Sequence, residues 1–152
     1  MFETKRCHFL LLLLALLPLL AAPGCFDPNF TGRYSGEAFM ADGESVAVTM
    51  EIKHLGDLFL ATVDFEDTGM EQGSGTADRF SFSVTTKSND TLDTWTQTSW
   101  NGRGVDSQGL GGIDTLTGIF IQKTFTTDRN GEPQMIDFRN GNFVLTTGPG
   151  GG

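Results

Sequence analysis

The feature that most constrains the fold of this chain is a stretch of strict alternation between residues 46 and 53. Its apolar positions are every second residue, Val46, Val48, Met50 and Ile52, with small, polar or charged residues between them. Side chains on a β-strand point to opposite faces with a period of two, so the stretch predicts a strand with one buried face and one wet face. No stretch after residue 25 sustains a helical period, so we expect the rest to be nearly all β.

Turn signals divide the chain after residue 31 into about eight strands. The first is expected over residues 32–40, ending at the hairpin signal Asp42-Gly43. A bulge is expected at the paired glycines Gly111-Gly112 within a long strand, and a final hairpin at Asn140-Gly141. Between the alternating stretch and that hairpin, the expected strands cover residues 58–65, 73–76, 80–84, 91–104 and 110–125.

Short turns between successive strands predict an antiparallel, up-and-down order. Closing such a sheet removes its exposed edges, so we expect a barrel of about eight strands over residues 32–147. A two-sheet β-sandwich is the alternative. An eight-stranded barrel has room inside for packed side chains or for one small ligand.

The N-terminal segment has the order of a secretory signal. Lys5-Arg6 precedes a leucine-rich run over residues 9–20, and small residues follow. The run is shorter than the roughly 20 residues that a membrane-spanning helix needs. We therefore predict a cleaved signal-peptide helix over residues 1–24.

The end of this segment resembles the lipobox of bacterial lipoproteins. Gly24 and Cys25 fit that pattern, whereas Ala22 stands where the family prefers leucine and Pro23 where it prefers a small residue other than proline. The resemblance implies that Cys25 becomes the first mature residue and is acylated, followed by a tether over residues 25–31. The alternative is ordinary cleavage with an unmodified Cys25. At the other end, residues 148–152 are expected to form a disordered glycine-rich tail.

Cysteine usage agrees with acylation. The chain has two cysteines, and Cys7 lies in the signal, which leaves Cys25 as a lone thiol in an oxidising compartment. Phe26 stands after the cysteine, where an aspartate would resemble an inner-membrane retention signal. The resemblance therefore implies an outer-membrane lipoprotein that faces the periplasm or the surface, held in the membrane by its acyl chains. A soluble secreted or periplasmic protein is the alternative.

Three phrases rich in glycine and aromatic residues resemble the strands of small exported bacterial β-barrels. They are Phe30-Thr31-Gly32-Arg33-Tyr34-Ser35-Gly36, Gly73-Ser74-Gly75-Thr76 and Gly141-Asn142-Phe143-Val144-Leu145. The architecture of those barrels is similar to the avidin and lipocalin-like folds. The resemblance implies a barrel and carries over no functional residue.

The charge balance and the polar residues limit the chemistry. Residues 25–152 carry a net charge near −10, which argues against binding nucleic acid, or an anionic membrane through charge. His54, the only histidine after the signal, has no partner arrangement typical of a catalytic base. The acidic stretch 64–71 and the loop 128–131 match no calcium-loop pattern. We therefore expect no catalytic residue, metal or cofactor, and no enzymatic activity.

Large apolar side chains provide the candidate contact residues. Trp95 and Trp100 are five residues apart on one expected strand, so at most one of them can point inward. Leu58-Phe59-Leu60 and Ile119-Phe120-Ile121 must each place an apolar side chain outside. If such groups gather beside a tryptophan, they form an exposed patch for a partner. The candidate ligand or partner contacts are Trp95, Trp100, Leu58, Leu60 and Phe120.

Three functional hypotheses follow, and the least favoured is an enzyme, because no catalytic cluster is visible in the sequence. The first is a lipid-anchored barrel of the cell envelope that binds a small apolar ligand or a protein partner. The second is a structural envelope lipoprotein with a filled core and no ligand. Free volume in the lumen would favour a small ligand, and a lumen packed with Phe and Met would favour the structural role. The sequence does not distinguish a monomer from an oligomer.

Overall fold

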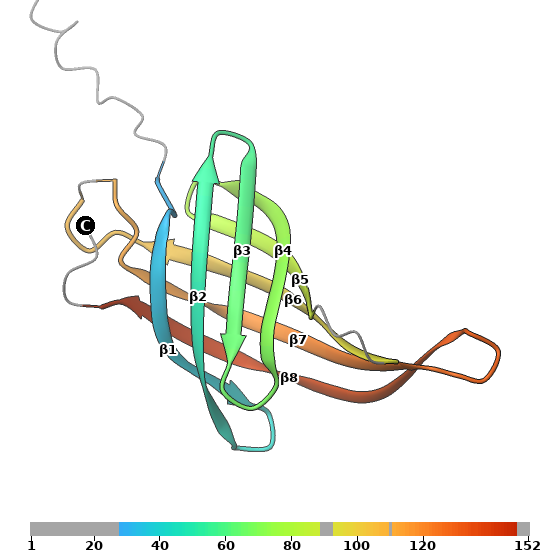
Figure 1. Cartoon of the computed structure of the whole chain (residues 1–152). Helices are drawn as coiled ribbons and strands as arrows, with labels where there is room; N and C mark the ends of the chain where they lie inside the picture. The colour runs from blue at the N-terminus through green and yellow to red at the C-terminus, as the bar shows by residue number, and fades with distance from the viewer. Residues whose placement is uncertain (1–27, 89–92, 110, 149–152) are drawn as a thin grey trace, which may run out of the picture.

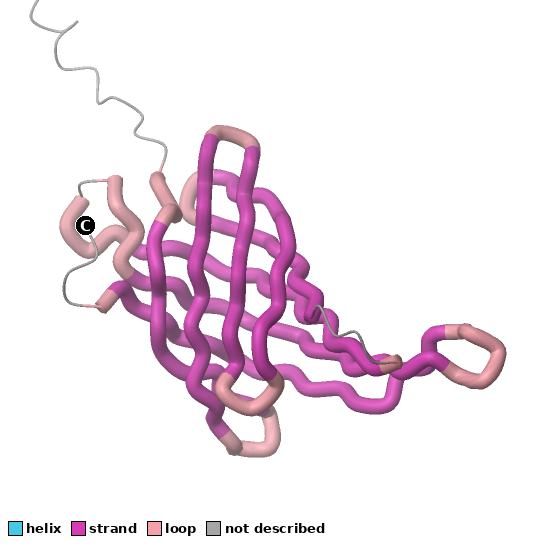
Figure 2. Tube along the Cα trace, viewed as in Figure 1, coloured by secondary structure: helices cyan, strands magenta, loops and turns pink. Residues whose placement is uncertain are grey.

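The computed structural model describes residues 28–88, 93–109 and 111–148, and these residues form a closed antiparallel barrel (Figure 1). The predicted signal peptide, Cys25 as the predicted site of lipid attachment, and residues 149–152 lie outside the described residues. Strands joined by loops make up the whole described part (Figure 2), which contains no helix able to cross a bilayer. The strands are β1 Gly32–Met40, β2 Ser45–Leu55, β3 Leu58–Phe65, β4 Gly69–Asp78, β5 Ser81–Ser88, β6 Thr94–Val105, β7 Thr115–Thr127 and β8 Pro133–Thr147.

The strand order confirms the predicted up-and-down barrel. Each strand pairs with the next in the chain, and β8 closes the ring against β1, from Tyr34 opposite Thr147 to Met40 opposite Gly141. The predicted alternation is also present, since Val48, Met50 and Ile52 of β2 are all buried. The sandwich alternative is therefore wrong.

The predicted final hairpin at Asn140-Gly141 is wrong, because β8 runs straight through these two residues. A Cβ atom on Gly141 would lie only 2.0 Å from the backbone oxygen of Phe39 on β1. The glycine is thus required for close approach of two strands rather than for a turn. The turn that joins β7 to β8 is the loop over residues 128–132, where Gly131 has a φ of +82°.

The predicted bulge at Gly111-Gly112 is wrong as well. These glycines lie in the connection between β6 and β7, and β7 begins only at Thr115. Gly112 forms a parallel bridge with Asn29, and the Asn29 backbone N–H donates to the Gly111 carbonyl at 2.9 Å. Gly111 has a φ of +86°, a backbone conformation that favours glycine, whereas a Cβ atom on Gly112 would meet nothing within 4 Å.

Residues 28–31, expected as part of a tether, pack against one end of the barrel. Phe30 is fully buried, and the Tyr34 hydroxyl donates to the backbone oxygens of Phe30 at 2.9 Å and Ile113 at 3.2 Å. Thr31 pairs with the His54 backbone through its hydroxyl. We call this the N-terminal end of the barrel; its other connections join β2 to β3, β4 to β5 and β6 to β7.

At the opposite end three strands extend beyond the rest of the barrel (Figure 1). We define the arm as residues 94–96 of β6, 123–127 of β7 and 133–139 of β8, with the loop 128–132 at its tip. The arm forms because β8 is 15 residues long and β7 is 13, whereas β5 has only eight. Its strands therefore continue after their neighbours have turned back.

Candidate functional site

The lumen is filled by the protein's own side chains. Trp100 lies at the centre, with its ring 5.4 Å from that of Phe65, 5.5 Å from Phe120 and 5.3 Å from Phe143. Space for the last of these rings depends on Gly102, where a Cβ atom would lie 2.8 Å from Phe143. The fully buried apolar side chains are Trp100, Tyr34, Phe30, Phe59, Phe65, Phe120, Phe143, Met50, Ile52, Leu116 and Leu145.

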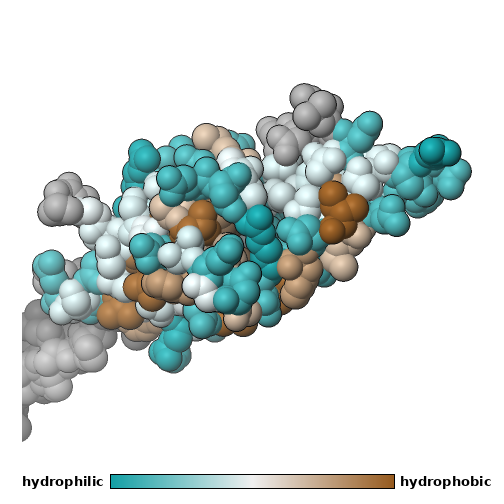
Figure 3. Space-filling model, turned by 90° about the horizontal axis from the view of Figure 1, so that it is seen from below, coloured by the Kyte–Doolittle hydropathy of each residue, from teal (hydrophilic) through white to brown (hydrophobic). Residues whose placement is uncertain are grey.

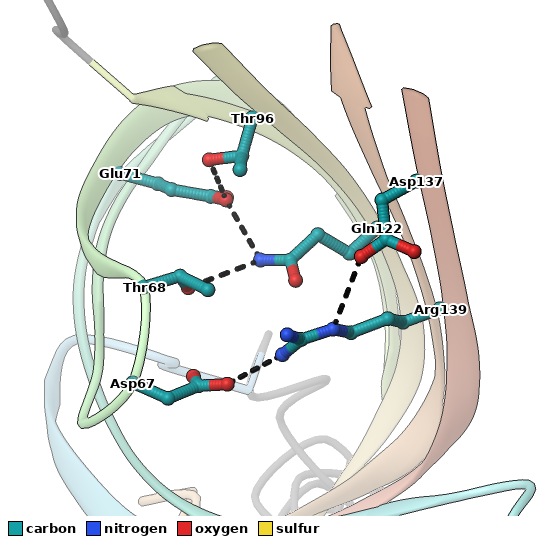
Figure 4. Close-up of polar contacts among 7 residues, drawn as sticks. All are labelled: Asp67, Thr68, Glu71, Thr96, Gln122, Asp137 and Arg139. Carbon is teal, nitrogen blue, oxygen red and sulfur yellow. Dashed lines mark hydrogen bonds and ion pairs between the residues drawn. The ribbon is translucent and has the colours of Figure 1, made fainter. Parts of the chain in front are cut away.

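A buried carboxylate lies between this aromatic core and the arm end. Glu71 of β4 is 1% exposed, and one of its oxygens accepts hydrogen bonds from the hydroxyls of Thr96 at 2.7 Å and Thr98 at 2.9 Å. The same oxygen accepts from the Gln122 side-chain amide at 3.1 Å (Figure 4). The other oxygen accepts from the Thr86 hydroxyl at 2.5 Å. Four neutral donors thus surround one carboxylate.

The carboxylate cluster is connected to the core and leaves no polar group open to a ligand. Trp100 donates its ring N–H to the Thr86 hydroxyl at 3.1 Å. No buried side-chain nitrogen or oxygen in the described residues lacks a hydrogen-bond partner. Because a ligand site needs polar groups that are free to orient the ligand, this cluster fits a structural role.

Charged residues close the barrel below the carboxylate cluster. Arg139 of β8 points across the mouth to Asp67 in the turn between β3 and β4, and its Nε lies 3.5 Å from Asp137 (Figure 4). The hydrogen bond to Asp67 raises the pKa of the Arg139 guanidinium. Gln122 also reaches Thr68 of the same turn at 3.4 Å. The turn therefore lies over the mouth.

An open groove of about 620 Å³ runs beside β8 at this end. One wall is β8 from Asp137 to Asn140, and the other is the hairpin between β1 and β2. Phe138, half exposed, provides the apolar surface on the β8 side. The charged side chains that line the groove are Asp42, Glu44, Asp67, Asp137 and Arg139.

The same part of β8 has a free edge. Pairing with β1 ends at Gly141, so within the described residues positions 133–139 pair with β7 alone. Strand edges present unpaired backbone N–H and C=O groups and can accept another strand. The edge is interrupted by a bulge, because Asp137 pairs with Thr124 and Met135 with Phe125, which leaves Ile136 between them. Pro133 and the bulge shield the edge in part.

Exposed apolar side chains recur along the outer face of β7 and β8 from the barrel onto the arm, with Lys123, Asn140 and Asn142 between them. Trp95 stacks on Phe125 with ring centroids 5.6 Å apart, and Met135 lies opposite Phe125. The exposed large apolar residues of the two strands are Ile119, Ile121, Met135, Ile136, Phe138 and Val144. Figure 3 shows hydrophobic residues on both the barrel and the arm, separated by hydrophilic ones. On the arm, Trp95, Phe125 and Met135 lie together, and an exposed apolar group of this kind can mark an interaction surface.

The predicted contact residues fall into three separate places. Trp100 and Phe120 are buried in the core, whereas Trp95 is half buried on the arm, so the two tryptophans do face opposite sides. Leu58 and Leu60 point outward from β3. In a ring of eight strands β3 lies opposite β7, so these leucines and the isoleucines beside Phe120 do not form one patch.

The groove and the carboxylate cluster were missed at the level of sequence. The groove depends on β8 continuing through Asn140-Gly141, where the sequence predicts a turn, so its lining residue Phe138 has no local signal of its own. Thr96 and Thr98, two apart, share a face with Trp100, which would have indicated a polar layer inside the barrel. Glu71 was read as part of an acidic loop, but it lies inside β4.

The remaining polar candidates do not gather into a site. His54 lies between aromatic rings, 5.7 Å from Phe30 and 5.5 Å from Phe59. In the part of the chain that the structure describes, no three His, Cys, Asp or Glu side chains are placed to hold a metal ion. Comparisons with protein-family models, with curated proteins and with solved structures gave no match.

Proposed function

We propose that the protein is a lipid-anchored, non-enzymatic interaction module of the bacterial outer membrane that binds an extended segment of a protein partner. The observation that carries this proposal is the free edge of β8 at residues 133–139, which borders an open groove. A partner strand that adds to such an edge gains main-chain hydrogen bonds, and pockets beside the edge select its side chains.

The filled lumen makes a small apolar ligand the weaker alternative. Such a ligand would have to displace rings that contact one another around Trp100. Close-packed interiors resist insertion, since even one extra methylene group is felt. A protein partner on the outer surface requires no such rearrangement.

A structural lipoprotein with a filled core is the other alternative, and the arm distinguishes it from a binding module. A purely structural barrel is stabilised by closing its edges, as the strands do around the body of this barrel, whereas in the arm both β6 and β8 have one edge that lacks a partner among the described strands. An arm with a free edge and exposed apolar side chains would add an aggregation hazard without a structural gain. The arm has no net charge, because it contains three basic and three acidic residues. These are Lys123, Arg129, Arg139, Asp128, Glu132 and Asp137.

The charge of the groove indicates the chemistry of the partner. Asp42, Glu44, Asp67 and Asp137 line it, and Arg139 is the one cation among its lining residues. The pairing of Arg139 with Asp67 leaves the groove acidic overall. Opposite charges steer association and exclude wrong partners. We infer that the bound segment carries Lys or Arg beside apolar residues that contact Phe138.

Anchoring is supported by the signal-like N-terminus and by the lone cysteine at its end. One acyl chain binds a membrane only weakly, so stable anchoring requires the multiple acylation that lipoproteins receive. The mass of the mature N-terminal peptide tests this part. A diacyl or triacyl cysteine at residue 25 supports it, and an unmodified Cys25 makes the protein a soluble exported one.

Native mass spectrometry of the mature protein released from its own cells tests the interaction. We expect a complex with a polypeptide, reduced about tenfold or more by Glu44→Lys, which reverses a charge in the groove. Glu51→Lys makes the same change on β2, outside the groove, and should leave the complex intact. A small-molecule adduct in place of a polypeptide would support the lumen ligand, and no adduct at all would support the structural role.

A further inference from the structure

The N-terminal end of the barrel lies close to the site of lipid attachment. Pro28, the first described residue, borders a groove together with His54, Gly56 and Asp57. Only three residue steps separate Cys25 from Pro28. Even a fully extended chain spans at most about 3.6 Å per residue, so acyl chains on Cys25 would hold this end within about 11 Å of their attachment point.

The hairpin of β2 and β3 carries exposed leucines at this same end. Leu55 and Leu58 face each other across the turn and are 73% and 49% exposed, and Leu60 follows on the same face. Figure 1 shows this hairpin extending farther than the other described strands at that end of the barrel. Leucines on a solvent-exposed turn have no role in the core, so they indicate a partner surface.

We propose that the N-terminal end rests on the bilayer, with Leu55 and Leu58 inserted at the boundary between lipid headgroups and acyl chains. This inference rests on the proposed lipid anchor. The anchor supplies the stable attachment, and the leucines fix the orientation of the barrel on the membrane. The apolar faces of interfacial segments sink about 5–10 Å into this boundary.

The charges at this end determine which lipid surface fits. Asp57 lies in the turn between the two leucines, Asp78 ends β4, and Arg79 lies in the turn from β4 to β5. These three side chains carry one positive and two negative charges, and residues 25–152 have a net charge near −10, so an anionic surface repels the domain as a whole. The surface that we propose is therefore zwitterionic, such as phosphatidylcholine or phosphatidylethanolamine.

Single-cysteine labelling tests the inference on the full lipidated chain. Acylation blocks the only cysteine of residues 25–152, so an introduced thiol can be labelled alone with an environment-sensitive fluorophore. The labelled variants are Leu55→Cys and Leu58→Cys at the hairpin, Thr62→Cys farther along β3, and Asn130→Cys at the tip of the arm. The protein is reconstituted in phosphatidylcholine vesicles that contain a spin-labelled quencher lipid, and flotation measures its attachment.

We expect quenching at residues 55 and 58 that is at least about twofold stronger than at residue 62. Four residues of strand separate 58 from 62 by about 13 Å, more than the depth of interfacial insertion. Residue 130 should not be quenched. Replacing part of the lipid with phosphatidylglycerol at low salt should weaken quenching at 55 and 58, and added salt should restore it.

The outcomes separate the orientation from the anchor. A protein that floats but shows equal quenching at residues 58, 62 and 130 contradicts the orientation and leaves the anchor intact. A fluorophore at 58 that is shielded from water without being quenched points to a second copy or a protein as the occupant, which also overturns the proposal. A protein that does not float contradicts the anchor and the orientation with it.

Discussion

The buried carboxylate of Glu71 stands out among the individual residues because no charge compensates it directly. Its four hydrogen-bond donors are three threonine hydroxyls and one glutamine amide, all neutral. Buried charges are costly unless they are paired or well hydrogen-bonded. Here the donors come from β5, β6 and β7, so one residue of β4 connects the four consecutive strands β4 to β7 inside the lumen.

Removal of this carboxylate should destabilise the barrel strongly. Glu71→Ala leaves several buried donors without an acceptor, at about 1–3 kcal/mol for each group, so we expect a loss of about 3 kcal/mol or more in the free energy of unfolding. Glu66→Ala, the same change at an exposed site, should cost less than about 0.5 kcal/mol. Denaturant unfolding followed by tryptophan fluorescence measures both. Equal stability of the two variants would contradict the assigned role of the cluster.

The ionisation of Tyr34 can be followed by its tyrosinate absorbance without overlap from other tyrosines, because the chain has a single tyrosine. Burial, with a smaller contribution from Asp114, raises the pKa of Tyr34 from 10.0 to about 12. The neutral phenol therefore contributes stability that is complete below pH 10 and is lost as the pH rises toward 12. The tyrosinate absorbance should appear near pH 12 in the folded protein and near pH 10 in denaturant. Ionisation near pH 10 with the fold intact would contradict the burial of Tyr34.

At the scale of elements, β8 shows why part of the fold could be predicted and part could not. The alternation in β2 is local and depends only on which face is buried, so the sequence predicts it correctly. Asn140-Gly141 has the composition of a tight turn, but its glycine is required by β1, which is far away in the chain. A contact between distant strands leaves no local signature.

Contacts between distant strands also explain why the sequence does not predict the groove or the Glu71 cluster. The groove depends on where β1 stops pairing with β8, and the cluster depends on which threonines face Glu71 across the lumen. Both are set by register between strands, which a turn signal alone does not determine. The opposite faces of Trp95 and Trp100, by contrast, follow from spacing within one strand and were predicted.

A substitution at Gly141 tests the structural reason for the unbroken strand. Gly141→Ala would place a Cβ atom against the Phe39 backbone, so we expect a loss of about 2 kcal/mol in the free energy of unfolding, since overpacking costs about 1–3 kcal/mol. The matched control is Gly148→Ala, because a Cβ atom there meets nothing within 4 Å. Thermal unfolding compares the two. If Gly141→Ala were as stable as the control, β1 and β8 could not lie this close.

On the scale of the whole molecule, we propose different roles for the two ends of the barrel. The N-terminal end holds the entering chain and the exposed leucines, and the arm extends from the opposite end (Figure 1). A barrel that rests on the membrane by its N-terminal end would therefore present the free edge of β8 away from the lipid. The filled lumen makes the barrel a rigid spacer between these two surfaces.

Site-specific photo-crosslinking in the protein's own cells tests the central claim, that a polypeptide binds at the free edge of β8. A photoreactive phenylalanine analogue replaces Phe138 in the groove or, as the control, Leu60 on β3, which is three strands from β8 around the ring and outside the groove. We predict one adduct of defined mass from residue 138, weakened by Glu44→Lys and unchanged by Glu51→Lys, and none from residue 60. No adduct at 138, or equal adducts at both positions, would contradict the claim.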